Sequence, residues 1–189
     1  MNQTNSSKTR MLEATQKLLR ERGYNGTGLN LVIKESGAPK GSLYHYFPDG
    51  KEQLASEAIT MAARSVRDRL EAAFDHSQSV AEACELILLG TIKELEDSDF
   101  QCGCPIATVA LEVAATSDRV YHVCDQAFDG LLNLFETRLL AAGYPAERSG
   151  DIANLLVTAY EGAMLLSRGQ RDTTPLRRLI SMIPAILHN

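Results

Sequence analysis

Residues 27–54 read TGLNLVIKESGAPKGSLYHYFPDGKEQL, and they contain two short helical patterns separated by a tight turn. The first pattern is an apolar stripe at helical spacing, formed by Leu29, Val32 and Ile33. Thr27 stands where it would cap the start of this helix, and Gly37 stands where it would end it. Pro39 suits the first turn of a second helix, because its ring fixes a helical φ and its missing N–H is not needed there. The segment predicts two short helices joined by a turn of a few residues.

The second of these helices has one apolar and one polar face. Leu43 and Phe47 share a face, which leaves the other to Lys40, Ser42, Tyr44 and His45. Two short helices joined by a tight glycine-containing turn form a helix-turn-helix, whose second helix enters the major groove of DNA. Gly41 would let the backbone approach the duplex, and Lys40 and Tyr44 would reach base edges. The alternative is a small bundle with an aromatic core, but three aromatic residues and a histidine within four positions cannot all point inward.

The rest of the chain is also helical in pattern. A first helix contains Met11 and Leu19 and closes at Gly23. Further apolar stripes bounded by caps, prolines and glycines span residues 51–74, 79–95, 105 onward, 118–140, 145–168 and 174–187. The polar stretch 96–101 is expected to be a loop. Since the sequence has no alternating β-branched runs and no internal repeats, it predicts an all-α fold of about nine helices.

Charge is unevenly distributed along the 189 residues, which carry a net charge of −5. The first 50 residues hold seven Lys/Arg and four Asp/Glu, whereas residues 51–189 hold 12 and 20. A basic module on an acidic body suits DNA binding, because Lys and Arg release counterions from the phosphate backbone. The longest uncharged apolar run, 102–111, is far shorter than the roughly 20 residues of a membrane span, and the polar start of the chain lacks the core of a signal peptide. We therefore expect a cytoplasmic protein with no membrane partner.

Four cysteines stand at positions 84, 102, 104 and 124, and a cytosolic setting would keep them reduced. Cys102 and Cys104 lie two positions apart beside a predicted helix start, so a redox switch or half of a metal site is an alternative. Because no CxxC or HxxxH pair completes a set of four zinc ligands, we expect no metal and no cofactor. A phosphate-binding glycine loop and a GxSxG turn on a strand are also missing. A thiol enzyme that uses Cys102 and Cys104, and a helical adaptor for other proteins, remain the alternatives to a DNA-binding regulator.

Several motifs occur together in the N-terminal quarter, namely Gly23-Tyr24, Thr27, Lys34-Glu35-Ser36-Gly37, Lys40-Gly41-Ser42-Leu43-Tyr44-His45-Tyr46-Phe47 and Lys51-Glu52-Gln53-Leu54. They resemble the DNA-binding domain of TetR/AcrR transcriptional regulators. Gly103-Cys104-Pro105 and Glu161-Gly162-Ala163 further resemble the LmrA/YxaF-like branch of that family. The resemblance covers the whole chain, since family members are all-helical homodimers of about this length. It implies a helix-turn-helix DNA-binding domain over 1–50 and a helical effector-binding and dimerisation domain over 51–189.

The resemblance also implies roles for individual residues. Thr27 and Gly28 would contact a phosphate at the start of the first helix of the pair. Base contacts would come from Lys40, Gly41, Ser42 and Tyr44, and backbone contacts from His45, Tyr46 and Lys51. A lysine at the start of a long helix makes physical sense, because the helix N-terminus adds its own positive potential. The expected partner is a palindromic operator in double-stranded DNA, bound by a repressor that a ligand releases.

Two apolar helices near the C-terminus are expected to pack against those of a second copy as a four-helix bundle, as in the family. The predicted dimer interface comprises Ile152, Leu155, Leu156, Ala159, Ala163, Leu166, Leu176, Leu179, Ile180 and Ile183. Burial within one protomer is the alternative.

The middle helices supply the residues of a predicted effector pocket. They are Phe74, Leu88, Phe100, Cys124, Phe128, Leu131, Tyr160 and Met164. The resemblance implies that the effector is small and largely apolar. Ordinary core packing is the alternative for each of these residues, because a stripe of apolar side chains looks the same in both cases.

Overall fold

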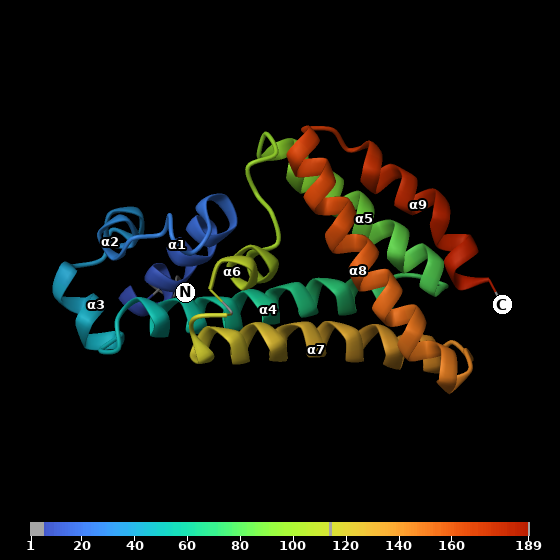
Figure 1. Cartoon of the computed structure of the whole chain (residues 1–189), viewed down its shortest axis with the longest axis horizontal. Helices are drawn as coiled ribbons and strands as arrows, with labels where there is room; N and C mark the ends of the chain where they lie inside the picture. The colour runs from blue at the N-terminus through green and yellow to red at the C-terminus, as the bar shows by residue number, and fades with distance from the viewer. Residues whose placement is uncertain (1–5, 114, 189) are drawn as a thin grey trace, which may run out of the picture. The chain divides into compact units, whose positions relative to one another are not determined.

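A computed structural model describes residues 6–113 and 115–188. Within these ranges the chain forms nine α-helices and no strand (Figure 1). The helices are α1 (Ser7–Arg22), α2 (Leu29–Ser36), α3 (Lys40–Tyr46), α4 (Lys51–Asp75), α5 (Val80–Asp97), α6 (Pro105–Val113), α7 (Asp118–Ala141), α8 (Ala146–Gln170) and α9 (Thr174–Leu187). The predicted all-α fold is confirmed.

The chain divides into two compact units, and α4 and α7 contribute to both. Unit 1 comprises Met1–Arg64 and Pro105–Ala127, and unit 2 comprises Ser65–Cys104 and Phe128–Asn189. Unit 1 therefore extends beyond the predicted 1–50 domain, because α6 packs against α1, Leu54 of α4 joins the N-terminal core, and Cys124 of α7 contacts Ile106 of α6. The functional boundary expected after residue 50 concerns which part binds DNA and which binds an effector, and it stays a prediction.

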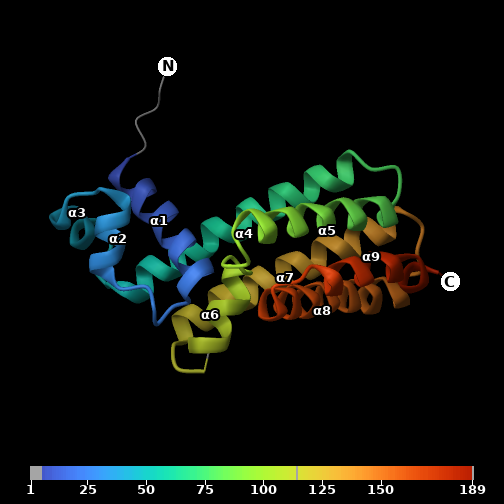
Figure 2. The same cartoon turned by 90° about the horizontal axis from the view of Figure 1, so that it is seen from above.

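In unit 1, α1 packs against α2, α3 and α6 (Figures 1 and 2). The buried core of these helices is formed by Met11, Leu18, Val32, Ala38, Leu43, Phe47 and Leu54. Each large apolar side chain buried in this way contributes on the order of 1.5–3 kcal/mol, so a small three-helix unit has a core sufficient to hold α3 in place. α1 ends at Gly23, whose φ of 70° is a conformation that favours glycine.

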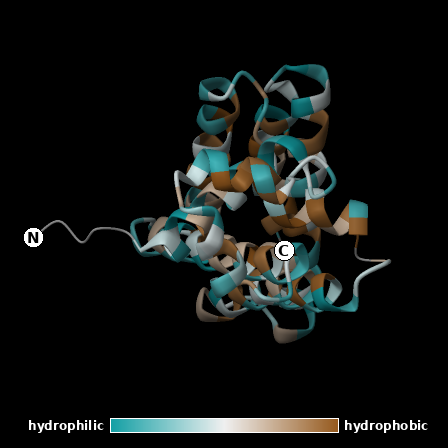
Figure 3. Ribbon diagram, turned by 90° about the vertical axis from the view of Figure 1, so that its left-hand side faces the viewer, coloured by the Kyte–Doolittle hydropathy of each residue, from teal (hydrophilic) through white to brown (hydrophobic). Residues whose placement is uncertain are grey.

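Unit 2 is a layer of helices in which α9 packs against both α5 and α8. The second half of α4 joins it through Phe74, whose ring meets that of Phe135 in α7 edge to face at 5.4 Å. Hydrophobic and hydrophilic residues alternate along the helices (Figure 3), as amphipathic helices around a shared core require. Among the described residues, no helix is both long enough and apolar enough to cross a membrane.

Most predicted helix boundaries agree with the structure, and two helix ends differ. The predicted cap of α5 is present, since the Ser79 hydroxyl accepts a hydrogen bond from the Glu82 N–H at 3.1 Å. α5 continues two residues further, to Asp97, where an ion pair of 2.6 Å with Lys93 supports the extension, so the predicted loop begins later. α8 passes Gly169 and closes at Arg171, whose φ is 52°, because backbone bonds to the last carbonyls form there.

Candidate functional site: a helix-turn-helix surface

α3 exposes a polar face and buries an apolar one. Leu43 and Phe47 are fully buried. The side chains or backbone of Lys40, Gly41, Tyr44 and His45 are exposed, whereas Ser42 and Tyr46 are half-buried. Tyr44 exposes 56% of its surface, which is a large fraction for an aromatic residue of a packed unit. Of the residues expected to read base edges, Lys40, Gly41 and Tyr44 are therefore accessible and Ser42 is partly so, on a helix whose opposite face is buried at Leu43.

The two glycines of this surface are not required by packing within the protein. A Cβ added at Gly28 or at Gly41 would meet no described atom within 4 Å, and neither residue has a positive φ. Glycine within a helix lowers helix stability by about 1 kcal/mol relative to alanine. Gly41 therefore weakens α3, and no contact within the described chain compensates for this loss. The remaining explanation for glycine at both positions is that it lets another molecule approach the backbone closely.

Thr27 does not cap α2, contrary to the prediction. The N-cap is Gly28, which has no side chain to accept a hydrogen bond. Thr27 is buried, and its hydroxyl donates to the Gly23 carbonyl oxygen at 2.7 Å, while its N–H donates to the Tyr24 carbonyl oxygen. The local turn after α1 therefore uses both donors of Thr27. A phosphate contact from this side chain, which the resemblance implied, would require the bond to Gly23 to break.

Lys51 begins α4 and lies over an aromatic ring. Its Nζ is 4.3 Å from the centroid of the Tyr24 ring, which is a cation–π contact. Partial burial lowers the pKa of Lys51, and the nearby carboxylate of Glu112 opposes that shift. Burial, and secondarily Glu52, raises the pKa of Tyr24. Lys51 remains half-exposed, so its ammonium group lies at the surface of unit 1 in contact with the Tyr24 ring.

Seven of the eight residues predicted to bind an effector lie together in unit 2. They form part of its core or pack against it: Phe74, Leu88, Phe100, Phe128, Leu131, Tyr160 and Met164. Cys124 is the exception, since it belongs to unit 1, where its thiol faces the Ile106 carbonyl oxygen at 3.9 Å. The apolar pattern of α7 continues through both units, so the sequence could not show that residues before position 128 belong to unit 1 and later ones to unit 2.

A polar pair interrupts this apolar core. The hydroxyls of Tyr160 in α8 and Thr91 in α5 lie 2.9 Å apart, and Thr91 donates to the Ile87 carbonyl oxygen. Burial raises the pKa of Tyr160 above its ordinary range, so the phenol stays protonated. Next to it in α8, burial raises the pKa of Glu161, and a hydrogen bond with the Cys104 side chain partly opposes that shift. Neither Thr91 nor Glu161 was among the residues predicted to bind an effector, although Glu161 belongs to the Glu161-Gly162-Ala163 motif, because a lone polar residue in an apolar stripe carries no distinguishing signal.

The four cysteines are free thiols. Burial raises the pKa of Cys84 to about 12 and that of Cys124 to about 11, so both stay protonated and unreactive at neutral pH. Cys102 and Cys104 are half-buried. In the part of the chain that the structure describes, no group of three or more His, Cys, Asp or Glu is placed to hold a metal ion.

The residues predicted to form a dimer interface divide into three groups by exposure. Five pack into their own protomer, namely Ile152, Leu156, Ala163, Leu176 and Ile183. Ala159, Leu179 and Ile180 are half-buried. Leu155 and Leu166 are exposed, and so are two large apolar neighbours that the prediction omitted, Leu165 and Met182. α8 and α9 thus both expose large apolar side chains, and the contact of these side chains with a second copy stays a prediction.

Comparison with known proteins adds two family matches and several close relatives. Residues 11–58 match the model described as bacterial regulatory proteins, tetR family, and residues 80–182 match that of the LmrA/YxaF-like transcriptional regulator C-terminal domain. The chain is 34% identical over 187 residues to the uncharacterized HTH-type transcriptional regulator YxaF of Bacillus subtilis, covering 99% of this chain and 98% of that protein. It is 35% identical to the HTH-type transcriptional regulator LmrA of the same organism, covering 96% of each.

Solved structures share the fold at lower sequence identity. A TetR transcriptional regulator from Legionella pneumophila superposes with a TM-score of 0.86 at 22% identity, covering 98% of each chain. The reduced form of NemR from E. coli superposes with a TM-score of 0.81 at 20% identity, covering 95% of each chain. These likenesses extend over both units.

Proposed function

The chain belongs to the TetR family of bacterial transcriptional regulators, with a C-terminal domain of the LmrA/YxaF-like type, and on this premise we propose that it is a repressor released from its operator by a small, largely apolar effector. Regulators of this family bind DNA, form dimers and are not enzymes. The thiol-enzyme alternative from the sequence is therefore wrong. Three points go beyond family membership and are our proposal: the protein binds a palindromic operator, it responds to a small effector, and it acts in the cytoplasm.

The exposed face of α3 is the observation that carries the proposal. Lys40, Tyr44 and His45 point away from anchors that are fully buried, so they are free to enter a major groove. Gly41 supports a close approach of the helix backbone to the duplex, since nothing in the described chain requires a glycine there. Gly28 supports the same reading at the start of α2. The phosphate contacts are assigned to Gly28, His45, Tyr46 and Lys51, and the base contacts to the first turn of α3 and Tyr44.

The exposed apolar side chains of α8 and α9 support a two-fold dimer. Two recognition helices must lie about 34–36 Å apart to read successive major grooves, so a palindromic operator requires a fixed dimer. Leu155 and Leu166 are the predicted interface residues with the largest exposed apolar area, and Leu165 and Met182 extend it. A second copy that covers these side chains removes apolar surface from water, which is the main driving force of such interfaces.

The core of unit 2 supports an effector of mixed character. The residues that would line a pocket there are mostly apolar, and polar groups come from the hydroxyls of Tyr160 and Thr91 and from the carboxyl of Glu161. A small apolar molecule with one or two polar atoms suits such a lining. Since α4 runs without interruption from Lys51 to Phe74, a displacement of its second half by the effector would be passed to its DNA end.

The redox alternative has less support. The Cys104 side chain is hydrogen-bonded to the buried carboxyl of Glu161, and an adjacent carboxylate disfavours a thiolate. The relative NemR was solved in a reduced form, and that description concerns that protein. We therefore assign Cys102 and Cys104 to the shape of the loop before α6.

The test begins with selection of duplex DNA from a random pool by the full-length protein. We expect an enriched palindrome whose affinity falls steeply with salt. A panel of small aromatic and aliphatic compounds is then titrated against free protein and against the complex. An effector that lowers operator affinity tenfold must bind the complex about tenfold more weakly, a coupling of about 1.4 kcal/mol. Failure to enrich any sequence would refute DNA recognition, and compounds that bind without changing operator affinity would refute induction.

A further inference from the structure

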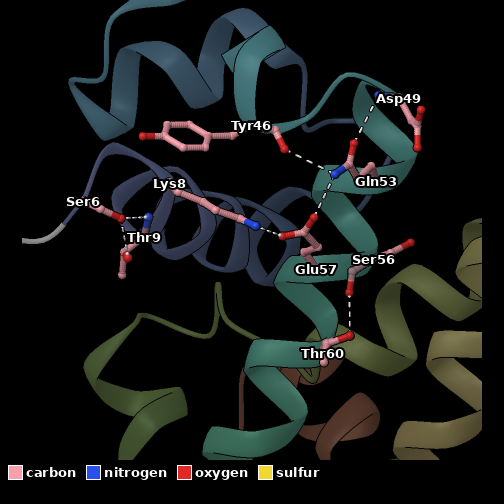
Figure 4. Close-up of polar contacts among 9 residues, drawn as sticks. All are labelled: Ser6, Lys8, Thr9, Tyr46, Asp49, Gln53, Ser56, Glu57 and Thr60. Carbon is pink, nitrogen blue, oxygen red and sulfur yellow. Dashed lines mark hydrogen bonds and ion pairs between the residues drawn. The ribbon is translucent and has the colours of Figure 1, made fainter. Parts of the chain in front are cut away.

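The C-terminal end of α3 is held by the side-chain amide of Gln53, which lies in the first turn of α4. Gln53 Nε2 donates to the Tyr46 carbonyl oxygen at 3.3 Å, and Gln53 Oε1 accepts from the Asp49 N–H at 3.1 Å (Figure 4). Tyr46 is the last residue of α3, so its carbonyl has no partner within the helix. One side chain therefore binds the end of the recognition helix and the loop that follows it.

The orientation of this amide is fixed by Glu57, one turn further along α4. Glu57 Oε1 accepts a second hydrogen bond from Gln53 Nε2 at 2.9 Å. The nitrogen of Gln53 thus faces two acceptors and its oxygen faces one donor, which is the only orientation that satisfies all three bonds. The second carboxylate oxygen of Glu57 is 2.8 Å from Lys8 Nζ in α1 (Figure 4). Lys8 Nζ also lies 5.7 Å from the Phe47 ring centroid.

These hydrogen bonds fix the direction of α3, which its buried apolar residues alone do not. Leu43 and Phe47 hold a helix of only seven residues against the core, but apolar contacts are non-directional and allow a short helix to tilt. Hydrogen bonds lose strength steeply with angle, so the bond to Tyr46 resists such a tilt. Because Tyr44 stands two residues before that bond, a small tilt of α3 would move its ring relative to a base edge.

We propose that Gln53 and Glu57, braced by Lys8, are positioning residues that set the tilt of the recognition helix and thereby its base specificity. This inference rests on the proposed function, since it assigns specificity to residues behind the DNA-reading face. They act through α3, and they do not contribute base contacts of their own.

The experiment compares full-length variants on the operator that wild-type protein selects and on a scrambled duplex of equal length. Gln53→Met keeps the side-chain length and removes all three hydrogen bonds without adding charge. We expect it to lower operator affinity about tenfold, which is the size of one lost base contact, and to change scrambled-duplex affinity by less than about twofold. Re-selection with this variant should give a less defined sequence at the positions nearest Tyr44. Gln126→Met, an exposed glutamine of α7 in the same unit, is the matched control and should leave both affinities unchanged.

Glu57 gives a second pair of variants. Glu57→Gln keeps an oxygen that can accept from Gln53 and should retain most of the discrimination, whereas Glu57→Leu removes it and should lose discrimination as Gln53→Met does. If Gln53→Met fails to fold, the comparison of the two Glu57 variants tests the proposal by itself. A merely structural role would lower the unfolding temperature and leave the ratio of operator to scrambled-duplex affinity unchanged, and that result would overturn the inference. If wild-type protein selects no sequence, the proposed function fails instead.

Discussion

The carboxylate of Glu112 accepts a hydrogen bond from the Asn25 N–H at 2.7 Å, which ties α6 to the turn that follows α1. The other carboxylate oxygen of Glu112 occupies the space beside Gly23, at 1.7 Å from where a Cβ would stand. Position 23 therefore needs glycine for two independent reasons, a φ of 70° and the closeness of this carboxylate. The helix-turn-helix is thus joined, within unit 1, to a helix that follows it by more than 50 residues in the sequence.

Gly23→Ala is expected to lower the free energy of unfolding by about 2.5–5 kcal/mol. A left-handed φ costs a residue with a Cβ about 1–2 kcal/mol, and displacing Glu112 breaks a charge-assisted hydrogen bond of about 1.5–3 kcal/mol. Urea unfolding measures the loss. In a Glu112→Ala background the same substitution should cost only the φ term. Gly143→Ala is the control, because its φ is 89° and a Cβ there meets nothing within 4 Å. Equal costs in both backgrounds would show that the two positions are uncoupled.

Tyr44→Ala is expected to cost about 1–3 kcal/mol in operator binding and to relax base preference at one position of each half-site. The ring is more than half exposed and packs little within the chain, so the fold should be nearly unaffected. Competition titrations with single-base operator variants measure the effect. Unchanged affinity and unchanged preference would remove Tyr44 from the base-reading face.

Lys51→Ala is expected to weaken all DNA alike and to reduce the salt slope of binding by about one unit, because one phosphate contact is lost. The contact with the Tyr24 ring adds a second effect, a loss of stability of about 0.5–1 kcal/mol at this partly exposed site. Tyr24→Leu separates the two, since it removes the ring contact and keeps the charge of Lys51. A loss of specificity without a change of slope would contradict a phosphate role.

The helix-turn-helix was predictable from the sequence because its signals are local. Apolar spacing, Pro39 and Gly37 identify two short helices without reference to the rest of the chain, and Gly37 indeed ends α2 with a φ of 60°. The Thr27 cap was wrong because two local arrangements compete for the same hydroxyl: in the turn after α1 the Gly23 carbonyl lies four residues back and within its reach, and Thr27 bonds to it and does not cap α2.

The contacts that join helices were not predictable in the same way. Glu112 lies 87 residues from Asn25, and Thr91 lies 69 residues from Tyr160, so no periodicity relates them. For α8, the sequence likewise could not predict which apolar residues are buried. Its stripe contains Leu156 on the inner face and Leu155 on the outer one, and adjacent apolar residues cannot be assigned to either face without knowing where α5 and α9 lie.

Leu166→Glu is expected to convert the dimer to a monomer and to lower operator affinity. The side chain is 53% exposed in the protomer, so a charge there is tolerated by the fold and unfavourable only in an apolar interface. Ala163 is a poorer test position, because it is 9% exposed and a charge there would be buried within the protomer. Analytical ultracentrifugation measures the assembly.

Leu111→Glu provides the control for this change, since Leu111 is 81% exposed on α6 and lies outside the predicted interface. It should remain dimeric. A Leu166→Glu protein that is monomeric and still binds a palindrome at full strength would contradict dimeric recognition.

Glu161→Gln is expected to stabilise the protein at neutral pH, in a manner that depends on pH. Burial raises the pKa of Glu161 in the folded state, which means that the folded protein binds this proton more tightly than the unfolded chain does. Below the ordinary glutamate pKa of 4.5 both states are protonated, and burial of the neutral acid carries no ionisation cost. As pH rises past that value the unfolded chain ionises first, so the wild-type protein loses stability until the folded carboxyl ionises too.

Glutamine is neutral at every pH, and its amide oxygen can still accept a hydrogen bond from the Cys104 thiol. The stability difference between variant and wild type should therefore be small at pH 4, grow in favour of the variant above pH 5 and level off once the folded carboxyl is ionised. Urea unfolding at fixed protein concentration, from pH 4 to pH 8, measures it. Glu85→Gln, an exposed carboxyl of α5, should show no such growth. A difference that stays constant across this range would mean that the Glu161 carboxyl is not penalised by burial, and a variant less stable than wild type at pH 7 would mean that its negative charge is held by an attraction stronger than the cost of desolvation.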